Sequence, residues 1–482
     1  MFVKNVILVV FFVFQIKMKL HSFVIMEVVV IISTVIMYKT VFKAYINSKE
    51  DITPKLPSNH PPLVKPPIPI SYKRPQCTPQ HNLASIKLHR VGGGIFHNVL
   101  VRYAMNHNAF VAIPDCACHM FFPGDIDKKS LYPEPVHPNF TGYNMFIDHA
   151  RFNRTATEEI LNPKPFFITQ IRDPFQQAVS VYDYLKTVPN SYSFSKFLTH
   201  PEELEKKRDF PCSCTPQQRV SFTRNLNAFE LGYLQAEENN ITDFEAYLTK
   251  LDLDLDHVTI LEQLPVSLAL LRRKLCWEFK DMLHLNVDGL HKRYHLSGLA
   301  LAKKKLDPDL EQKEAHRNWS SLNYMLYDHF RFKLEQEVKT QDSFFKDEVG
   351  ELTRIQAKFE KFCSNICVYF FHVGMQDVQK TREIFAENYL SFPSTPLYDA
   401  FNVTFRDCVM LRQEEEISRK MLLYHMNSDA CMKHPTMARD ILKIHCAERM
   451  QVMPGLGASD MRFLFNLKEC ELMFNRRLDK DY

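Results

Sequence analysis

Three consecutive glycines at positions 92–94 form the most informative short motif of this 482-residue chain, which contains only 12 glycines. They follow an apolar, strand-like stretch at 83–89 and precede a helical pattern of apolar residues that begins near Ile95. Backbone N–H groups of such a turn can converge on an anion, and the start of a helix adds partial positive charge. With Arg90 beside it, the motif predicts a phosphate-binding loop, although the steric demands of a strand-to-helix turn would also explain the glycines.

Two features limit what this loop can bind. A Walker loop continues with Lys and then Ser or Thr after its last glycine, whereas Ile95 and Phe96 stand here, which argues against hydrolysis of nucleoside triphosphates. The formal net charge of the chain is only +4, which argues against nucleic acid as a partner. An anion site must therefore depend on the local placement of arginines and lysines.

A second anion-binding group is expected around Arg172. It follows the apolar run 166–171 and precedes Asp173 and Pro174, which have a sufficient explanation as the cap and first residue of a helix. Ser180 lies eight residues after Arg172, on the first turns of that helix. A guanidinium and a hydroxyl placed in this way can hold one phosphate from two directions, whereas the alternative is that Arg172 pairs with a nearby carboxylate.

The elements that position these residues form an α/β pattern. Short apolar runs alternate with helical segments, which is typical of a parallel sheet with helices on both faces. The expected strands are 83–89, 110–113, 145–147, 166–171 and 258–261. Ligands of such sheets bind at the carboxyl ends of the strands, where His89, Arg172 and Glu262 stand. From about Leu322 onward the pattern is predominantly helical.

The N-terminal region predicts a membrane anchor. We expect a short cytoplasmic tail at 1–19 and a transmembrane helix at 20–40, which reaches a marginal spanning length and contains Glu27. A cleaved signal peptide is the alternative, but the first alanine is Ala44, so no small-residue cleavage site follows the apolar stretch. Nine of the 27 prolines lie between Pro54 and Pro79, which indicates a semi-rigid stem at 41–80.

Residues 81–482 are expected to form one folded domain in the lumen of the secretory pathway. All 12 cysteines follow the anchor, in agreement with an oxidising compartment, and their pairing cannot be read from the sequence. The chain also contains five glycosylation sequons beyond the anchor, at Asn139, Asn153, Asn240, Asn318 and Asn402. The whole plan is that of a type II membrane protein.

The two anion-binding groups at this spacing resemble those of sulfotransferases, and more narrowly those of the galactose 3-O-sulfotransferase family, which includes the galactosylceramide sulfotransferase. The resemblance extends over roughly residues 80–475. It is carried by Lys87-Leu88-His89-Arg90, His149-Ala150-Arg151-Phe152-Asn153, Ile171-Arg172-Asp173-Pro174 with Ser180, Phe229-Glu230-Leu231-Gly232, and further stretches at 224–225, 262–277, 326–330 and 446–450.

The resemblance implies a P-loop-like sulfotransferase fold and a donor, 3′-phosphoadenosine 5′-phosphosulfate. The 5′-phosphosulfate would be held by Lys87, Arg90, Val91, Gly92, Gly93, Gly94 and Ile95, and the 3′-phosphate by Arg172, Ser180 and Arg224. In the family the loop usually reads Lys-Thr-His-Lys-Thr followed by hydroxyl residues. Here Arg90 replaces the second lysine, and Gly93-Gly94-Ile95 stands in place of the hydroxyl residues.

The resemblance also implies roles in sulfuryl transfer. Arg90, with Lys87 assisting, would neutralise the leaving phosphosulfate oxygen, so that no metal is required. His89 and His149 are the two candidates for the base that accepts the proton of the acceptor hydroxyl, with a structural role as the alternative for each. Glu262 would orient the base or bind sugar hydroxyls, or else cap the following helix, and Arg224 would otherwise have an ordinary surface role.

The cysteine motifs allow a further interpretation. Cys116-Ala117-Cys118-His119 and Cys212-Ser213-Cys214 could ligate zinc, but a Cys-x-Cys spacing is tighter than that of usual zinc ligands, so we expect disulfides. Cys363 and Cys367 lie one helical turn apart. Cys276 and Trp277 end an apolar helix face, and we expect both to be core residues.

The resemblance, together with the type II plan, thus implies an enzyme of the Golgi membrane that sulfates the 3-hydroxyl of a terminal galactose on a glycolipid or glycan acceptor. A homodimer is compatible with the sequence. Two alternatives stay open: a membrane-anchored carbohydrate- or nucleotide-binding protein that kept the fold but lost catalysis, and a sulfotransferase for another sugar position. The changed glycine loop motivates the first of these.

Overall fold

The computed structural model describes residues 77–116, 120–161, 163–185, 194–201, 214–215, 220–285, 310–364, 389–411 and 415–427. All of them belong to one compact unit, Tyr72–Tyr482. The expected tail at 1–19, the expected transmembrane helix at 20–40 and most of the expected stem at 41–80 lie outside the described residues. Among the helices that are described, none has the length and apolar character needed to cross a membrane.

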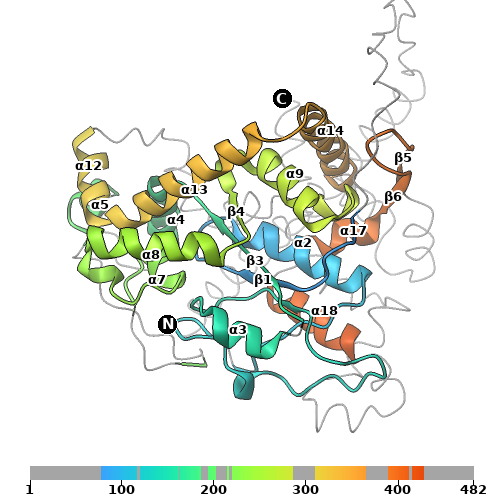
Figure 1. Ribbon diagram of the computed structural model, residues 1–482, viewed down its shortest axis with the longest axis horizontal. Coiled ribbons are helices and arrows are strands. Elements are labelled where there is room, and N and C mark those ends of the chain that lie inside the picture. Colours follow the sequence, from blue (N-terminus) through green and yellow to red (C-terminus); the bar gives the residue numbers. More distant parts are fainter. Residues whose placement is uncertain are drawn as a thin grey trace, which may run out of the picture. The chain divides into compact units, whose positions relative to one another are not determined.

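A four-stranded parallel sheet forms the centre of the unit (Figure 1). Its order is β2-β1-β3-β4. The strands are β1 (Leu83–Ile86), β2 (Met145–Phe146), β3 (Phe166–Ile171) and β4 (His257–Ile260). In register, Leu83 of β1 lies between Met145 of β2 and Phe166 of β3. The predicted parallel sheet is therefore confirmed, and its carboxyl ends bring the segments after Ile86, Ile171 and Ile260 to one edge.

The strand bounds differ from the prediction at every strand except β3. β2 ends at Phe146 and not at residue 147, and β4 is shifted by one residue to His257–Ile260. The two larger differences are at β1 and at residues 110–113. β1 ends at Ile86 and not at His89, because residues 87–92 turn away from the sheet into the glycine loop. The expected strand 110–113 is reduced to one parallel bridge between Val111 and Met145. β3, by contrast, has the bounds that its continuous apolar run predicts.

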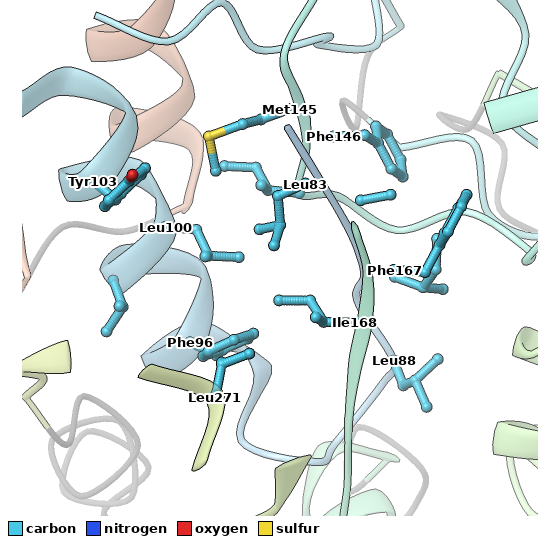
Figure 2. Packing of buried hydrophobic residues seen from close by; sticks show 14 of the residues in the cluster. Leu83, Leu88, Phe96, Leu100, Tyr103, Met145, Phe146, Phe167, Ile168 and Leu271 are labelled. Atoms are coloured by element: carbon cyan, nitrogen blue, oxygen red, sulfur yellow. The ribbon is translucent and has the colours of Figure 1, made fainter. Parts of the chain in front are cut away.

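Helices cover both faces of the sheet, as predicted. Ile168 of β3 points toward Phe96 of α2 (Gly93–Asn106) and Leu271 of α9 (Leu264–Leu275), while its neighbour Phe167 points to the opposite side (Figure 2). There the guanidinium of Arg154, on α3 (Arg154–Ile160), lies 4.7 Å from the centre of the Phe167 ring. Alternate side chains of one strand thus pack against different helical layers, as the two-residue period of a strand requires.

The other helices lie around this core. They are α4 (Pro174–Leu185), α5 (Phe194–Thr199), α7 (Leu226–Glu230), α8 (Ile241–Asp254), α12 (Leu310–Trp319), α13 (Ser321–Lys339) and α14 (Phe345–Ser364). Short 3₁₀ turns occur at Lys128–Ser130, Ala236–Glu238, Leu261–Gln263 and Lys280–Met282. The predominantly helical region predicted from about Leu322 agrees with α13 and α14.

The C-terminal part adds one feature that the helical pattern did not predict. An antiparallel pair, β5 (Tyr389–Phe392) and β6 (Phe401–Thr404), precedes α17 (Phe405–Met410) and α18 (Glu415–Met426). In Figure 1 both helices, in orange, lie beside α2, in blue. A segment more than 300 residues away in sequence therefore packs on the helix that starts at the glycine loop.

Three disulfides connect the described cysteines: Cys77–Cys276, Cys116–Cys214 and Cys363–Cys408. Cys118, His119, Cys212 and Cys367 lie outside the described residues. The disulfide expected in place of zinc is present at Cys116 and Cys214. Trp277 is a core residue, as predicted, and is 2% exposed. Cys276 is not one: it ends α9 in the left-handed region (φ 55°), is partly exposed, and ties the domain to Cys77.

Candidate active site

The glycine loop is held in place by side chains from β3 and α4. Gln170 Nε2 donates to the carbonyl of Val91 (2.6 Å), and Gln177 Nε2 donates to the carbonyl of His89 (2.9 Å). Both glutamines are buried. Because the loop carbonyls of His89 and Val91 are bonded to these amides, side chains of β3 and α4 fix the loop to the carboxyl edge of the sheet.

The backbone conformation explains Gly92, and a close contact with the Lys87 side chain accounts for Gly93. Gly92 caps α2 with φ 82°, and an added Cβ would lie 3.0 Å from Leu261 Cδ1. At Gly93 an added Cβ would lie 3.2 Å from the stem of Lys87. At Gly94 the nearest atom is Glu415 Oε1, at 3.8 Å, so a side chain fits there. Sterics thus account for Gly92 and Gly93 but do not require Gly94.

The two predicted anion-binding groups meet in the structure. Arg90 adopts a left-handed conformation (φ 62°), and its Nε donates to Ser180 Oγ over 3.0 Å. Arg172 Nη1 approaches the carbonyl oxygen of Arg90 at 3.4 Å. Two guanidinium groups and a hydroxyl therefore lie at one edge of the sheet, which gives this edge the positive charge that binding of a phosphate or sulfate needs.

Lys87 also lies at the loop, but its charge already has a partner. Its ammonium group forms an ion pair with Glu415 Oε1 at the start of α18. Burial alone would raise the pKa of Glu415, yet the nearby charges of Lys87, His97 and Arg419 hold that pKa well below its usual range. Arg419 in turn bonds to Asp148, which is fully buried, through Nε (2.8 Å) and Nη2 (2.6 Å).

His89 is in close contact with a buried carboxylate. Its Nδ1 lies 2.5 Å from Glu230 Oε1, and its backbone N–H donates to both carboxylate oxygens, at 3.0 and 3.1 Å. Glu230 is fully buried at the end of α7. The imidazole ring packs against Phe122 at 4.6 Å between ring centres and meets the edge of Phe222 at 5.2 Å.

His149 lies directly on this ring. The two imidazoles are stacked with their centres 4.1 Å apart. Burial, followed by the charges of Lys87, His89 and Arg419, lowers the pKa of His149 well below its usual value. Its Nδ1 is buried without a hydrogen-bond partner. The two histidines predicted as alternative bases are therefore neighbours, and His149 is neutral at physiological pH.

Within the described part of the chain, one cluster of side chains has ligand atoms close enough together to suggest a metal ion, and it consists of His89, His149 and Glu230. The ligand atoms of His89, His149 and Glu230 lie within 4.8 Å of one another. Two ligands of a tetrahedral zinc ion lie roughly 3.3 Å apart, since each is about 2.0 to 2.1 Å from the ion. The 2.5 Å between His89 Nδ1 and Glu230 Oε1 is instead a hydrogen bond.

Two predicted residues lie beside this cluster and not in it. Glu262 accepts from the backbone N–H of Asp173 (3.1 Å) and from the hydroxyl of Tyr327 (3.3 Å), so it braces the ends of β3 and β4. The carboxylate that orients His89 is that of Glu230. The Arg224 guanidinium lies over the ring of Trp319 at 4.6 Å, and its Nε is buried without a partner.

Sequence reasoning missed four residues that shape the site: Glu230, Gln170, Gln177 and Glu415. Glu230 lies in the matched stretch Phe229-Glu230-Leu231-Gly232, where a carboxylate among apolar residues is a signal of a buried polar contact. Gln170 carries a similar signal inside the apolar run of β3. Nothing local marks Glu415, which meets Lys87 only because α18 packs on α2.

Comparison with known proteins identifies the family of this chain. The sequence profile of the family described as galactose-3-O-sulfotransferase matches residues 11–369. The chain is 28% identical over 282 residues to the human galactose-3-O-sulfotransferase 3, an alignment that covers 56% of this chain and 59% of the relative. The mouse galactose-3-O-sulfotransferase 3 is 30% identical over 261 residues, which cover 52% and 55% of the two chains.

A bovine galactosylceramide sulfotransferase is 23% identical over 298 residues, which cover 60% of this chain and 65% of that protein. The chain thus spans about three fifths of the length of the curated relatives that it matches. No solved structure matches the chain significantly.

Proposed function

The chain belongs to the galactose-3-O-sulfotransferase family, and from this premise we propose that it transfers a sulfuryl group from 3′-phosphoadenosine 5′-phosphosulfate to a galactose hydroxyl. The acceptor we propose is the 3-hydroxyl of a terminal galactose on a glycolipid or glycan. The observation that carries the proposal is the meeting of Arg90, Ser180 and Arg172 beside the His89–Glu230 pair at the carboxyl edge of the sheet.

The donor fits the charge of this edge. We assign the 5′-phosphosulfate to the start of α2 and to Arg90, and the 3′-phosphate to Arg172 and Ser180. The N–H groups of Gly93 and Gly94 belong to the first turn of α2, where they have no partner within the helix. Arg224, whose buried Nε lacks a partner, is a further cation for the nucleotide. Glu262 braces the loops that carry these groups.

The chemistry is a direct displacement at sulfur. The acceptor oxygen loses its proton to a base and attacks the sulfur, while the bond between sulfur and the bridging oxygen breaks. The electron pair of that bond stays on the phosphate oxygen of the leaving 3′-phosphoadenosine 5′-phosphate, where the guanidinium of Arg90 stabilises it. Lys87 assists when its ammonium group is turned from Glu415 to the donor.

We place the enzyme in the Golgi membrane as a type II protein with its catalytic domain in the lumen. The three disulfides among the described cysteines support an oxidising compartment, since such bonds persist there and are rare in the cytosol. The apolar stretch at 20–40 is the proposed anchor.

The test uses the full chain purified in detergent, the donor labelled with ³⁵S, and a panel of β-galactosides that includes galactosylceramide, a terminal lactosamine and 3-O-methyl derivatives of both. We expect transfer to the unmodified acceptors and none to the 3-O-methyl derivatives. Transfer to the methylated acceptors would reject the 3-hydroxyl, and absence of transfer to every acceptor would reject the enzymatic function.

A second candidate is a member of the fold that binds the nucleotide without catalysis. The observation in its favour is the ion pair of Lys87 with Glu415, which places a carboxylate next to Gly94 at the proposed sulfate site. Such a protein would bind 3′-phosphoadenosine 5′-phosphate in a calorimeter and transfer no sulfate in the same preparation.

A further inference from the structure

We propose that Glu230 is the positioning residue of a base dyad, in which it fixes the tautomer of His89 so that Nε2 accepts the proton of the acceptor hydroxyl. This inference rests on the proposed function and deepens it, because it selects one of two neighbouring histidines and names the carboxylate that acts through it.

The contact between the two residues determines the position of one proton. A carboxylate only accepts hydrogen bonds, so the 2.5 Å contact between Glu230 Oε1 and His89 Nδ1 requires a proton on Nδ1. The neutral ring then carries its lone pair on Nε2, which is the nitrogen that can act as a base. The alternative tautomer would set a lone pair against the carboxylate oxygen.

The surroundings hold the dyad in one geometry. Glu230 is fully buried, and the backbone N–H of His89 binds both of its oxygens, so the carboxylate cannot rotate without the loss of these bonds. Gln177 connects the two elements, because its Nε2 donates to the carbonyl of His89 and to Asn227 Oδ1 on α7. The ring itself packs against Phe122 and His149.

The negative charge of Glu230 is what makes His89 suitable as a base. When Nε2 takes the acceptor proton, the imidazolium lies beside a buried carboxylate that is already hydrogen-bonded to it, and the negative charge of that carboxylate stabilises the imidazolium. His149 is less suited to act as this base. Its pKa is lowered well below the usual value, first by burial, and Lys87 and Arg419 add positive charge to its surroundings.

The kinetic test is a double-mutant cycle on the full chain with Glu230→Gln, His89→Gln and both changes together. We expect Glu230→Gln alone to lower kcat by about 100- to 10,000-fold with an unchanged KM for the donor. In the His89→Gln background the same change should cost less than about 2-fold, since a residue that acts only through His89 has nothing left to position. Equal losses in the two backgrounds would overturn the proposal.

The matched control is Glu348→Gln. Glu348 is 1% exposed and pairs with Arg272 and Arg273 on a different part of the unit, so its replacement removes a buried carboxylate without touching the site. The kcat of Glu348→Gln should stay within about 2-fold of that of the wild type. A loss as large as that of Glu230→Gln would show that any buried carboxylate matters equally, which would contradict a positioning role.

A readout without turnover separates this proposal from the proposed function. Nitrogen NMR of the full chain with ¹⁵N-labelled histidine rings, in which the His89 signals are identified by their loss in His89→Gln, reports the tautomer directly. We expect the proton on Nδ1 in the wild type. A proton on Nε2 would overturn the proposal, whatever the activity. If Nδ1 carries the proton and no acceptor is sulfated, the assignment of the tautomer stands and the proposed function fails.

Discussion

Arg90 donates through Nε to Ser180 Oγ over 3.0 Å, across 90 residues of sequence. The glycine loop and the helix that follows β3 are therefore joined by a hydrogen bond in which the hydroxyl orients a guanidinium, and we propose that the two together bind the donor. Arg90 holds this position in a left-handed backbone conformation, which is uncommon for an arginine and is stabilised by its surroundings.

Ser180→Ala tests this unit. The change removes a hydroxyl that binds Arg90 and that we assign to the 3′-phosphate, and hydrogen bonds to charged groups contribute about 1.5 to 3 kcal/mol. We expect the Kd for 3′-phosphoadenosine 5′-phosphate to rise about 10- to 100-fold in calorimetry. Thr249→Ala, which removes an exposed hydroxyl on α8, is the control and should leave the Kd unchanged. An unchanged Kd in Ser180→Ala would reject the assignment.

Gly94→Ser introduces a hydroxyl at a position where the resemblance described above implies hydroxyl residues. Because an added Cβ has room there and glycine is unfavourable inside a helix, the free energy of unfolding should stay equal or rise by up to about 1 kcal/mol. The new donor should tighten nucleotide binding by about 2- to 10-fold.

Gly92→Ala is the contrasting variant, because φ is 82° and Leu261 is close. Its free energy of unfolding should fall by about 1 to 3 kcal/mol in urea titrations. Equal stability of the two variants would contradict the loop geometry.

Glu415→Gln tests the ion pair that holds Lys87. Loss of the carboxylate charge releases the ammonium group for the donor, so the Kd for 3′-phosphoadenosine 5′-phosphate should fall by roughly 3- to 10-fold. Glu335→Gln, which removes a half-exposed carboxylate paired with Arg331 on α13, is the matched control. Weaker binding in Glu415→Gln would show that Glu415 helps to hold the donor instead of competing with it.

His97 makes stability depend on pH. It is buried between the carbonyl of Ile147 and Ser418 Oγ, and burial, followed by the charge of Lys87, lowers its pKa to about 4. In the unfolded chain His97 binds a proton near pH 6.5, whereas in the folded chain it binds one only near pH 4. The contribution of the neutral, buried imidazole to the free energy of unfolding is therefore complete above pH 6.5 and is lost as the pH falls toward 4.

Between pH 7.5 and 5 the loss from His97 should be about 2 kcal/mol of unfolding free energy in urea titrations. His97→Gln should make the decrease smaller by about this amount, whereas the exposed His200→Gln should leave it unchanged. An equally steep decrease in His97→Gln would show that other groups, such as the buried His149 and His257, account for it.

The pattern of apolar residues was sufficient to predict the bounds of a strand that is buried along its whole length. β3 has the predicted bounds because its apolar run is buried from Phe167 to Ile171. The expected strand at 110–113 is equally apolar, yet only Val111 pairs with the sheet. A buried segment that pairs with a sheet and one that does not can both consist of a short apolar run, so the sequence pattern alone cannot distinguish the two.

The site was predicted as far as its residues lie in recognisable motifs. Arg90, Arg172, Ser180, His89 and His149 are indeed near one another. The residues that bind and orient these side chains come from distant segments of the chain. Glu230, which bonds to His89, is 141 residues from it, and Glu415, which pairs with Lys87, belongs to α18. Such contacts depend on how helices pack, and a single sequence holds no local record of that packing.

The central claim is that this edge of the sheet binds the donor and that His89 then removes the acceptor proton. Donor binding and turnover measured in the same preparations of wild type and His89→Gln test it most directly. We expect the wild type to transfer ³⁵S-sulfate to a β-galactoside. In His89→Gln we expect an unchanged Kd for 3′-phosphoadenosine 5′-phosphate and a kcat lower by at least about 100-fold. A variant that keeps its turnover, or a wild type that binds the nucleotide and sulfates none of the galactosides, would contradict it.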